Sequence, residues 1–295
     1  MKILVTGATG KLGSRIVETL LRTVPANQLA VSVRNPEKAE GLKTQGVEVR
    51  QGDFDKPETL DYAFAGIDRL LIISTSEVRL GGDEIRMRQL ANAVAAAGRA
   101  RVKFIAFTSA PKASESRFFL ASVYKATEAA IVKTKIPYSF LRNNWYLENE
   151  IESIQGAITG APWITATGDG KVGWVLRQDL AEATAAVLTE NGHENTIYEF
   201  SGKLMTYKEL VSILGTVLGK EIPLQQVDDT TYAEIMKGAG VPEAYLPLLV
   251  NIQKGIREGG LEVESNDIEK LLGRPITPIS EALKQIVNQI PYTKI

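Results

Sequence analysis

The chain opens with an apolar run that leads into a glycine-rich turn, Ile3-Leu4-Val5-Thr6-Gly7-Ala8-Thr9-Gly10-Lys11-Leu12-Gly13. The apolar run predicts a strand, and the apolar residues from 12 to 21 recur with the spacing of one helix face. The three glycines lie at the junction and repeat as G-x-x-G-x-x-G. A strand, a glycine turn and a helix in this order predict a pyrophosphate site at the helix N-terminus.

The glycines of this turn have separate expected roles. Gly7 permits the tight turn, Gly10 lets the backbone approach the pyrophosphate, and Gly13 allows close packing of helix on strand. The residues expected to bind a dinucleotide here are Gly7, Ala8, Thr9, Gly10, Lys11 and Leu12. A Walker phosphate loop is excluded, because no Gly-Lys-Ser or Gly-Lys-Thr follows at the required spacing. The alternative is a tight turn without a ligand.

Strand and helix patterns alternate through the first half of the chain. Strands are expected at 3–5, 29–33, 47–49, 70–73, 104–107 and 138–141, and helices at 12–21, 86–98 and 120–133, with Gly98 as a helix stop. This alternation predicts an α/β fold, a doubly wound parallel sheet of the Rossmann type.

The rhythm breaks beyond about residue 145. Helices are expected at 180–188, 207–218 and 280–290, the last capped by Ser280, and short strands near 172–175 and 197–200. We therefore expect a cofactor-binding domain at 1–145 and a smaller, mostly helical substrate lobe at 146–295. Whether segments near 172–200 return to the first domain stays open.

The end of the second strand predicts the type of cofactor. An NAD site places a carboxylate there for the ribose 2′-hydroxyl, but this strand ends Val33-Arg34-Asn35-Pro36. Arg34 is placed to bind a 2′-phosphate, which predicts NADP, and Lys38 could add a second cation. The alternative is a solvated Arg34. Asp53, after the third strand, is expected near the adenine or as a cap of the helix that begins near Pro57.

The tyrosines do not provide the Tyr-Lys pair common in such folds. None of the nine has Lys four residues later; Tyr124 has Glu128 and Tyr138 has Arg142. His193, the sole histidine, lies in an expected surface turn, and one histidine without cysteine predicts no metal site.

What remains is hydride transfer to a strong electron acceptor such as a quinone, which needs mainly positioning and oxyanion stabilisation. The carboxyl ends of the strands carry Ser74, Thr75 and Ser76 after the fourth strand and Asn143 with Trp145 after the sixth. Asn143 is a candidate donor to a developing oxyanion, and Trp145 is a candidate aromatic wall. Both could instead serve packing.

Composition excludes several classes of function. With 34 Lys+Arg against 35 Asp+Glu, the net charge of −1 predicts no nucleic acid or anionic membrane as partner. Zero cysteines exclude disulfides and a thiol nucleophile. No apolar stretch approaches the ~18 residues of a membrane span, and the opening run is too short for a signal peptide. We therefore expect a cytoplasmic protein.

Several segments together resemble one known family. They are Thr6 to Gly13, Val33 to Pro36, Gly52-Asp53-Phe54, Ile73 to Ser76, Phe140 to Asn143 with Trp145-Tyr146, and Gly168 to Lys171. The chain resembles the NmrA-like branch of the atypical short-chain dehydrogenase/reductases, in particular its bacterial quinone oxidoreductases and triphenylmethane-dye reductases.

The resemblance implies a set of cofactor contacts. NADPH is expected on the glycine turn, on Arg34 and on the backbone around Ser74, Thr75 and Ser76. Contacts near the nicotinamide are implied for Tyr138, Ser139, Phe140, Leu141, Arg142, Asn143 and Asp169. The substrate is expected in a cleft between the lobes. Tyr124 stands where relatives carry His, so Tyr124 substitutes for that residue or the substrate differs. Lys11 replaces a more usual Gln and could add a phosphate contact.

The sequence therefore predicts an enzyme that uses NADPH, without flavin, to reduce a quinone-like small molecule. Two alternatives stay open. One is an NADP-binding redox sensor that acts through a protein partner, and the other is a reductase of an unrelated small carbonyl compound. A homodimer also stays open.

Overall fold

The computed structural model describes residues 1–75, 82–116 and 118–290. The chain forms two compact units. The first comprises Met1–Ser114, Leu120–Asn143 and Leu180–Tyr198, and the second comprises Glu115–Phe119, Asn144–Asp179 and the chain from Glu199 onward. The division after Asn143 lies near the expected boundary at residue 145, and the segment from Leu180 returns within the range left open above.

The first unit is built on a seven-stranded sheet in the order β3-β2-β1-β4-β5-β6-β9. The strands are β1 (Ile3–Thr6), β2 (Leu29–Val33), β3 (Glu48–Gln51), β4 (Arg69–Ile72), β5 (Phe104–Ser109), β6 (Tyr138–Asn143) and β9 (Thr196–Phe200). The pairings from β3 through β6 are all parallel, with Ile3 opposite both Leu29 and Arg69. Strand order reverses at β1, between β2 and β4, which confirms the doubly wound α/β fold.

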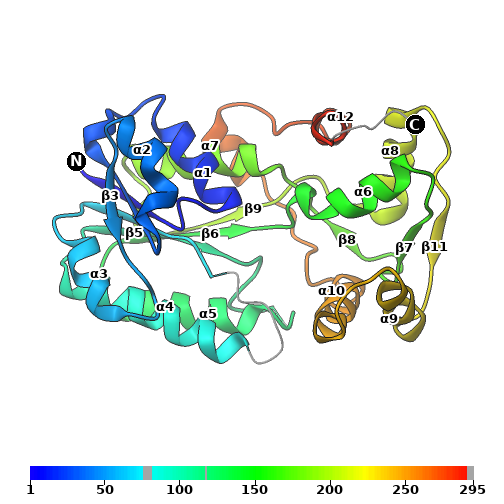
Figure 1. The fold of residues 1–295 in the computed structure, drawn as a ribbon, viewed down its shortest axis with the longest axis horizontal. Helices are drawn as coiled ribbons and strands as arrows, with labels where there is room; N and C mark the ends of the chain where they lie inside the picture. Colours follow the sequence, from blue (N-terminus) through cyan, green and yellow to red (C-terminus); the bar gives the residue numbers. More distant parts are fainter. Residues whose placement is uncertain (76–81, 117, 291–295) are drawn as a thin grey trace. The chain divides into compact units, whose positions relative to one another are not determined.

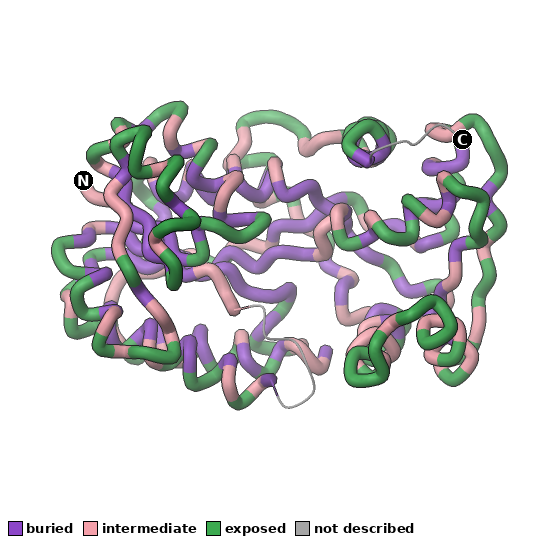
Figure 2. The backbone as a smooth tube through the Cα atoms, viewed as in Figure 1, coloured by how far each residue is buried: buried purple, intermediate pink, exposed green. Residues whose placement is uncertain are grey.

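Helices cover both faces of this sheet (Figure 1). On one face lie α1 (Lys11–Leu20), α2 (Glu40–Thr44) and α7 (Arg177–Thr189), and on the other lie α3 (Pro57–Phe64), α4 (Gly82–Arg99) and α5 (Ala121–Lys133). The central strands are buried on both faces (Figure 2), as their continuous apolar runs require. Phe64, Leu90 and Phe107 belong to the core between the sheet and α3, α4 and α5.

Several expected helix ends differ from those observed: α4 begins at Gly82 and not at residue 86, and α7 begins at Arg177 and not at residue 180. The expected stop at Gly98 and the expected cap at Ser280 are also wrong. Helix α4 continues through Gly98 to Arg99, and the chain takes the left-handed conformation only at Arg101, with φ of 54°. Helix α12 (Ile279–Gln289) begins after Pro278, so Ser280 lies inside it and does not cap it. Pro278 occupies the N-cap position itself, with ψ of 140°, and no side chain caps this helix.

The second unit contains two short two-stranded sheets. Strand β7 (Trp163–Thr165) pairs in parallel with β11 (Leu224–Gln226), and β8 (Lys171–Val172) pairs antiparallel with β10 (Met205–Thr206). The helices of this unit are α6 (Ile151–Ile158), α8 (Tyr207–Leu218), α9 (Asp229–Gly238), α10 (Leu246–Arg257), α11 (Asp267–Leu272) and α12. Helix α8 begins with a capping box between Thr206 and Glu209 and ends at the left-handed Gly219.

Short 3₁₀ helices complete the description, at Ala26–Gln28, Pro36–Ala39, Leu147–Glu150 and Glu243–Tyr245. Among the residues that the structure describes, no helix combines the length and apolarity needed to cross a membrane.

A buried carboxylate organises part of the second unit. Oε1 of Glu150 accepts hydrogen bonds from Trp145 Nε1 at 3.0 Å, Trp174 Nε1 at 3.1 Å and the Tyr207 hydroxyl at 2.8 Å. Burial raises the pKa of Glu150, and these three donors partly offset that rise. Trp145 is thus fixed from one edge of its indole ring.

Candidate cofactor site

The glycine turn lies where β1 meets α1. Gly7 has φ of 61°, a left-handed conformation, and its carbonyl accepts the Gly10 N–H at 2.9 Å. A Cβ on Gly13 would lie 2.2 Å from the Gly7 carbonyl oxygen, so only glycine lets the helix pack this close to the turn. Helix α1 has no side-chain N-cap and no acid in its first turn. Its N-terminal N–H groups therefore form an anion site.

This turn is one wall of a cavity of about 460 Å³ in the first unit. The lining residues are Thr6, Gly7, Thr9, Gly10, Lys11, Leu12, Gly13, Ser32, Val33, Arg34, Gly52, Asp53, Phe54, Ile73, Ser74, Thr75 and Gln89. They come from the carboxyl ends of β1 to β4, from the start of α1 and from α4. The cavity therefore lies at the strand-order reversal, where ligands of doubly wound sheets bind.

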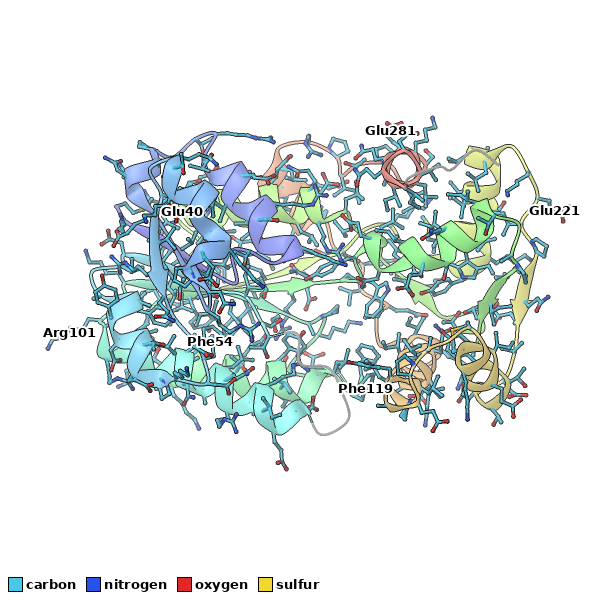
Figure 3. All side chains as sticks on the ribbon, in the orientation of Figure 1. Glu40, Phe54, Arg101, Phe119, Glu221 and Glu281 are labelled. Atoms are coloured by element: carbon cyan, nitrogen blue, oxygen red, sulfur yellow. The ribbon has the colours of Figure 1, made fainter. Side chains whose placement is uncertain are left out.

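The charges and glycines of the cavity suit a phosphorylated ligand. Lys11 and Arg34 place two positive charges on its wall. A Cβ on Gly52 would lie 2.1 Å from Ser32 Oγ, so glycine keeps the wall beside β3 open. Phe54, labelled in Figure 3, stands in the turn between β3 and α3.

Three buried polar atoms on the wall need a partner. Ser32 Oγ, Thr75 Oγ1 and Gln89 Oε1 are buried and make no hydrogen bond within residues 1–75, 82–116 and 118–290. Buried polar atoms are nearly always satisfied in folded proteins, so unsatisfied ones around one cavity indicate a polar ligand. The residues present therefore fit a dinucleotide.

Much of the expected cofactor set gathers here. Gly7, Thr9, Gly10, Lys11, Leu12, Arg34, Asp53, Ser74 and Thr75 all line the cavity. Ala8 is buried and does not line the cavity. Lys38 does not line the cavity either. Asp53 does not cap α3, whose N-cap position is Lys56. Ser76 lies outside the described residues.

The expected contacts from β6 are not brought to this cavity. Tyr138 starts the strand, at the edge opposite its carboxyl end, and stacks on Phe140 with ring centroids 4.3 Å apart. The Ser139 hydroxyl donates to the His193 carbonyl at 2.5 Å, and Leu141 is fully buried. These side chains are occupied by packing within the first unit.

Arg142 is held by a buried ion pair. Its Nε and Nη2 lie 3.0 and 2.7 Å from the two oxygens of Glu128, and the Ser109 hydroxyl donates to Glu128 at 2.6 Å. Glu128 stands four residues after Tyr124, where the usual Tyr-Lys pair has its lysine. Its carboxylate forms the ion pair that neutralises Arg142. Asn143 is buried at the end of β6, outside the cavity lining.

Asp169 belongs to the second unit. It lines a separate hollow there with Gly168 and Gln226. His193, expected on the surface, lies in the turn between α7 and β9 and is only 9% exposed, and its Nδ1 lies 2.7 Å from the Tyr198 hydroxyl.

Tyr124 lies next to one residue of the cavity wall, Ser74. Its hydroxyl lies 3.4 Å from the hydroxyl of Ser74, which lines the cavity, and the Ser74 N–H donates to Thr108 at 2.9 Å. The guanidinium of Arg86, fully buried, stacks on the Tyr124 ring at 5.1 Å. The Tyr124 hydroxyl thus lies beside the cavity wall, next to Ser74, with its ring held by Arg86.

The lining residues that the sequence analysis did not single out are Ser32 and Gln89. Ser32 carried a local signal, because it is polar within the apolar second strand. Gln89 carried none, since it lies on a helix with many polar residues.

Comparisons with known proteins agree with this arrangement. The model of the NmrA-like family matches residues 1–278. The chain is 39% identical over 287 residues to "Quinone oxidoreductase 2" of Escherichia coli (strain K12), covering 97% of this chain and 99% of that protein.

Two solved structures are similar over almost their whole length. Citrobacter sp. triphenylmethane reductase complexed with NADP(H) has a TM-score of 0.92 at 42% identity, covering 97% of this chain and 100% of that chain. The Escherichia coli NADPH-dependent quinone oxidoreductase QOR2 complexed with NADPH has a TM-score of 0.91 at 38% identity, with the same coverage. The family model covers most of this chain, which therefore belongs to the NmrA-like family.

Proposed function

We propose that this protein is an NADPH-dependent oxidoreductase that transfers a hydride directly to a quinone or a similar conjugated acceptor, without flavin. One observation carries the proposal: a single cavity joins the uncapped helix N-terminus, two cations and three unsatisfied buried polar atoms. The likeness to relatives named as a quinone oxidoreductase and as an NADP(H)-bound reductase supports it.

The chain's own residues divide the work of binding. The N–H groups at the start of α1 hold the pyrophosphate, and Arg34 pairs with the 2′-phosphate while Lys11 adds a second positive charge. Thr75 and Ser74 bind polar groups at the end of β4. When bound, NADPH supplies the hydride.

The acceptor also needs a proton and orientation. Tyr124 donates the proton from its place beside Ser74. We propose that Asn143 donates a hydrogen bond to the acceptor oxygen and that Trp145, held by Glu150, lies against the acceptor ring. A cytoplasmic location and a homodimeric assembly remain predictions, measurable by cell fractionation and by light scattering.

The first experiment compares NADPH and NADH as reductants of a benzoquinone, followed by nicotinamide absorbance. Quinone-dependent oxidation of NADPH, much faster than of NADH, supports the proposal. Tight binding of NADPH without turnover across several acceptors would instead favour a non-catalytic sensor. Failure to bind either nucleotide would overturn both.

The same assay tests whether Arg34 makes the protein prefer NADPH to NADH. Arg34→Ala removes a charge-assisted hydrogen bond and is expected to weaken NADPH binding about 10- to 100-fold, with little change for NADH. Arg22→Ala, at an exposed arginine outside the cavity, is the matched control. An equal loss for both nucleotides in Arg34→Ala would contradict the role of Arg34.

A further inference from the structure

Gln89 presents a buried side-chain carbonyl to the cofactor cavity. It lies on α4, is 9% exposed and lines the cavity. Its Oε1 makes no hydrogen bond in the described part of the chain. A glutamine that is buried and half satisfied at a cavity wall indicates a ligand group that donates a hydrogen bond.

The orientation of this amide follows from its other contact. Gln89 Nε2 donates to Asp55 Oδ2 at 2.8 Å, and Arg88 donates to Asp55 Oδ1 at 2.8 Å. The Arg88 and Gln89 hydrogen bonds hold the pKa of Asp55 below its usual value, so it is ionised at neutral pH. An ionised carboxylate only accepts, so the NH₂ group of Gln89 must face Asp55 and the carbonyl must face the other way.

The neighbours of Gln89 place it on the adenosine side of the cavity. Asn92, one helix turn along α4, donates to the Phe54 carbonyl at 2.8 Å, and the Asp55 N–H donates to Asp53 at 3.0 Å. The Asn92 contact ties α4 to the turn after β3, and the Asp55 contact lies within that turn, next to the strand end that carries Arg34. The adenosine half of a dinucleotide binds over these strands. Its exocyclic amine is a donor that suits a carbonyl.

We propose that Gln89 selects the base of the cofactor, its Oε1 accepting a hydrogen bond from the adenine amine, with Asp55 as the positioning residue that prevents the amide from turning over. This inference rests on the dinucleotide of the proposed function. It adds a base-reading contact to the phosphate contacts made by Arg34 and the glycine turn.

The test compares NADPH with its hypoxanthine analogue, which carries a carbonyl oxygen in place of the amine. The dissociation constants are measured by calorimetry without any acceptor. The wild-type protein is expected to prefer NADPH by about 10- to 100-fold, because the analogue sets one acceptor against another. Gln89→Leu is expected to bring this ratio close to one.

A second variant tests the orientation itself. Asp55→Asn offers either a donor or an acceptor to Gln89, so the amide can turn over and donate to the analogue. The analogue is then expected to bind more tightly than it binds the wild-type protein. Because the Asp55 side chain is 41% exposed, this variant should fold even where Gln89→Leu does not. Gln45→Leu, at an exposed glutamine outside the cavity, is the matched control and should keep the wild-type ratio.

The outcomes separate this inference from the proposed function. A wild-type protein that binds both nucleotides equally, or a Gln89→Leu variant that weakens both by the same factor, overturns the role of Gln89. The second result would also appear if a ribose hydroxyl were the donor. A protein that binds neither nucleotide overturns the proposed cofactor itself.

Discussion

The contact between Gly13 and the glycine turn gives a prediction with a magnitude. In Gly13→Ala the added methyl carbon would lie 2.2 Å from the Gly7 carbonyl oxygen, 2.8 Å from its carbon and 2.9 Å from Ala8 Cα. All three are backbone atoms, so no side chain can turn aside. A carbon needs about 3.5 Å from such neighbours, and α1 must therefore move by roughly 1 Å.

Overpacking of this kind costs about 1–3 kcal/mol. For about 2 kcal/mol the expected fall in Tm is roughly 4–8 °C. The shift of α1 also moves its N-terminal N–H groups, so the Kd for NADPH is expected to rise. The assay is thermal unfolding followed by circular dichroism, with and without NADPH. NADPH stabilises only the state that binds it, so the transition that it raises is that of the first unit.

Gly10→Ala is the comparison variant in the same turn. Its methyl carbon would lie 3.2 Å from the Gly7 oxygen, and Gly10 has φ of −83°, which any residue adopts. We therefore expect almost unchanged Tm without ligand but weaker NADPH binding, because Gly10 lines the cavity. If Gly13→Ala unfolds at the wild-type temperature and binds NADPH normally, the close-packing argument is refuted.

Three further predictions concern a proton, a buried acid and a surface acid. Tyr124→Phe should slow benzoquinone reduction about 100-fold or more in steady-state assays. It should leave the reduction of a cationic triphenylmethane dye unchanged, because that reaction takes a hydride and no proton. An equal loss of rate with both acceptors would contradict a proton-donor role. Glu150→Gln keeps the oxygen that accepts from three donors and should change the free energy of unfolding by less than about 1 kcal/mol, whereas Glu150→Leu should cost about 3–5 kcal/mol in urea unfolding. Hydrogen bonds from Arg50 and Lys2 lower the pKa of Glu48 from 4.5 to about 2, so its stabilisation is present above pH 4.5 and is lost as pH falls toward 2. At 42% exposure this amounts to about 1 kcal/mol or less, and Glu48→Gln should lower stability at neutral pH but not in strong acid.

The sequence by itself determined the fold and the glycine turn that lines the cavity. Strand and helix periods are local properties, so most expected elements lie within one or two residues of those observed, and helix 207–218 matches α8 at both ends. The glycine turn was equally readable, because its conformation and its place before a helix depend on adjacent residues. Arg34 followed from its position at the end of one strand.

Only the tertiary structure decided which distant side chains meet. Asp55 and Gln89 lie 34 residues apart in sequence, and only the packing of α4 on the turn after β3 makes one orient the other. Glu128 was visible as a missing lysine, but its role as the partner of Arg142 requires α5 to lie against β6. Tyr138 was expected at the cofactor but lies at the amino end of its strand. Hydrophobic periodicity and turn residues depend on residues that are close together in the sequence. Hydrogen-bond partners depend instead on which elements the fold brings side by side.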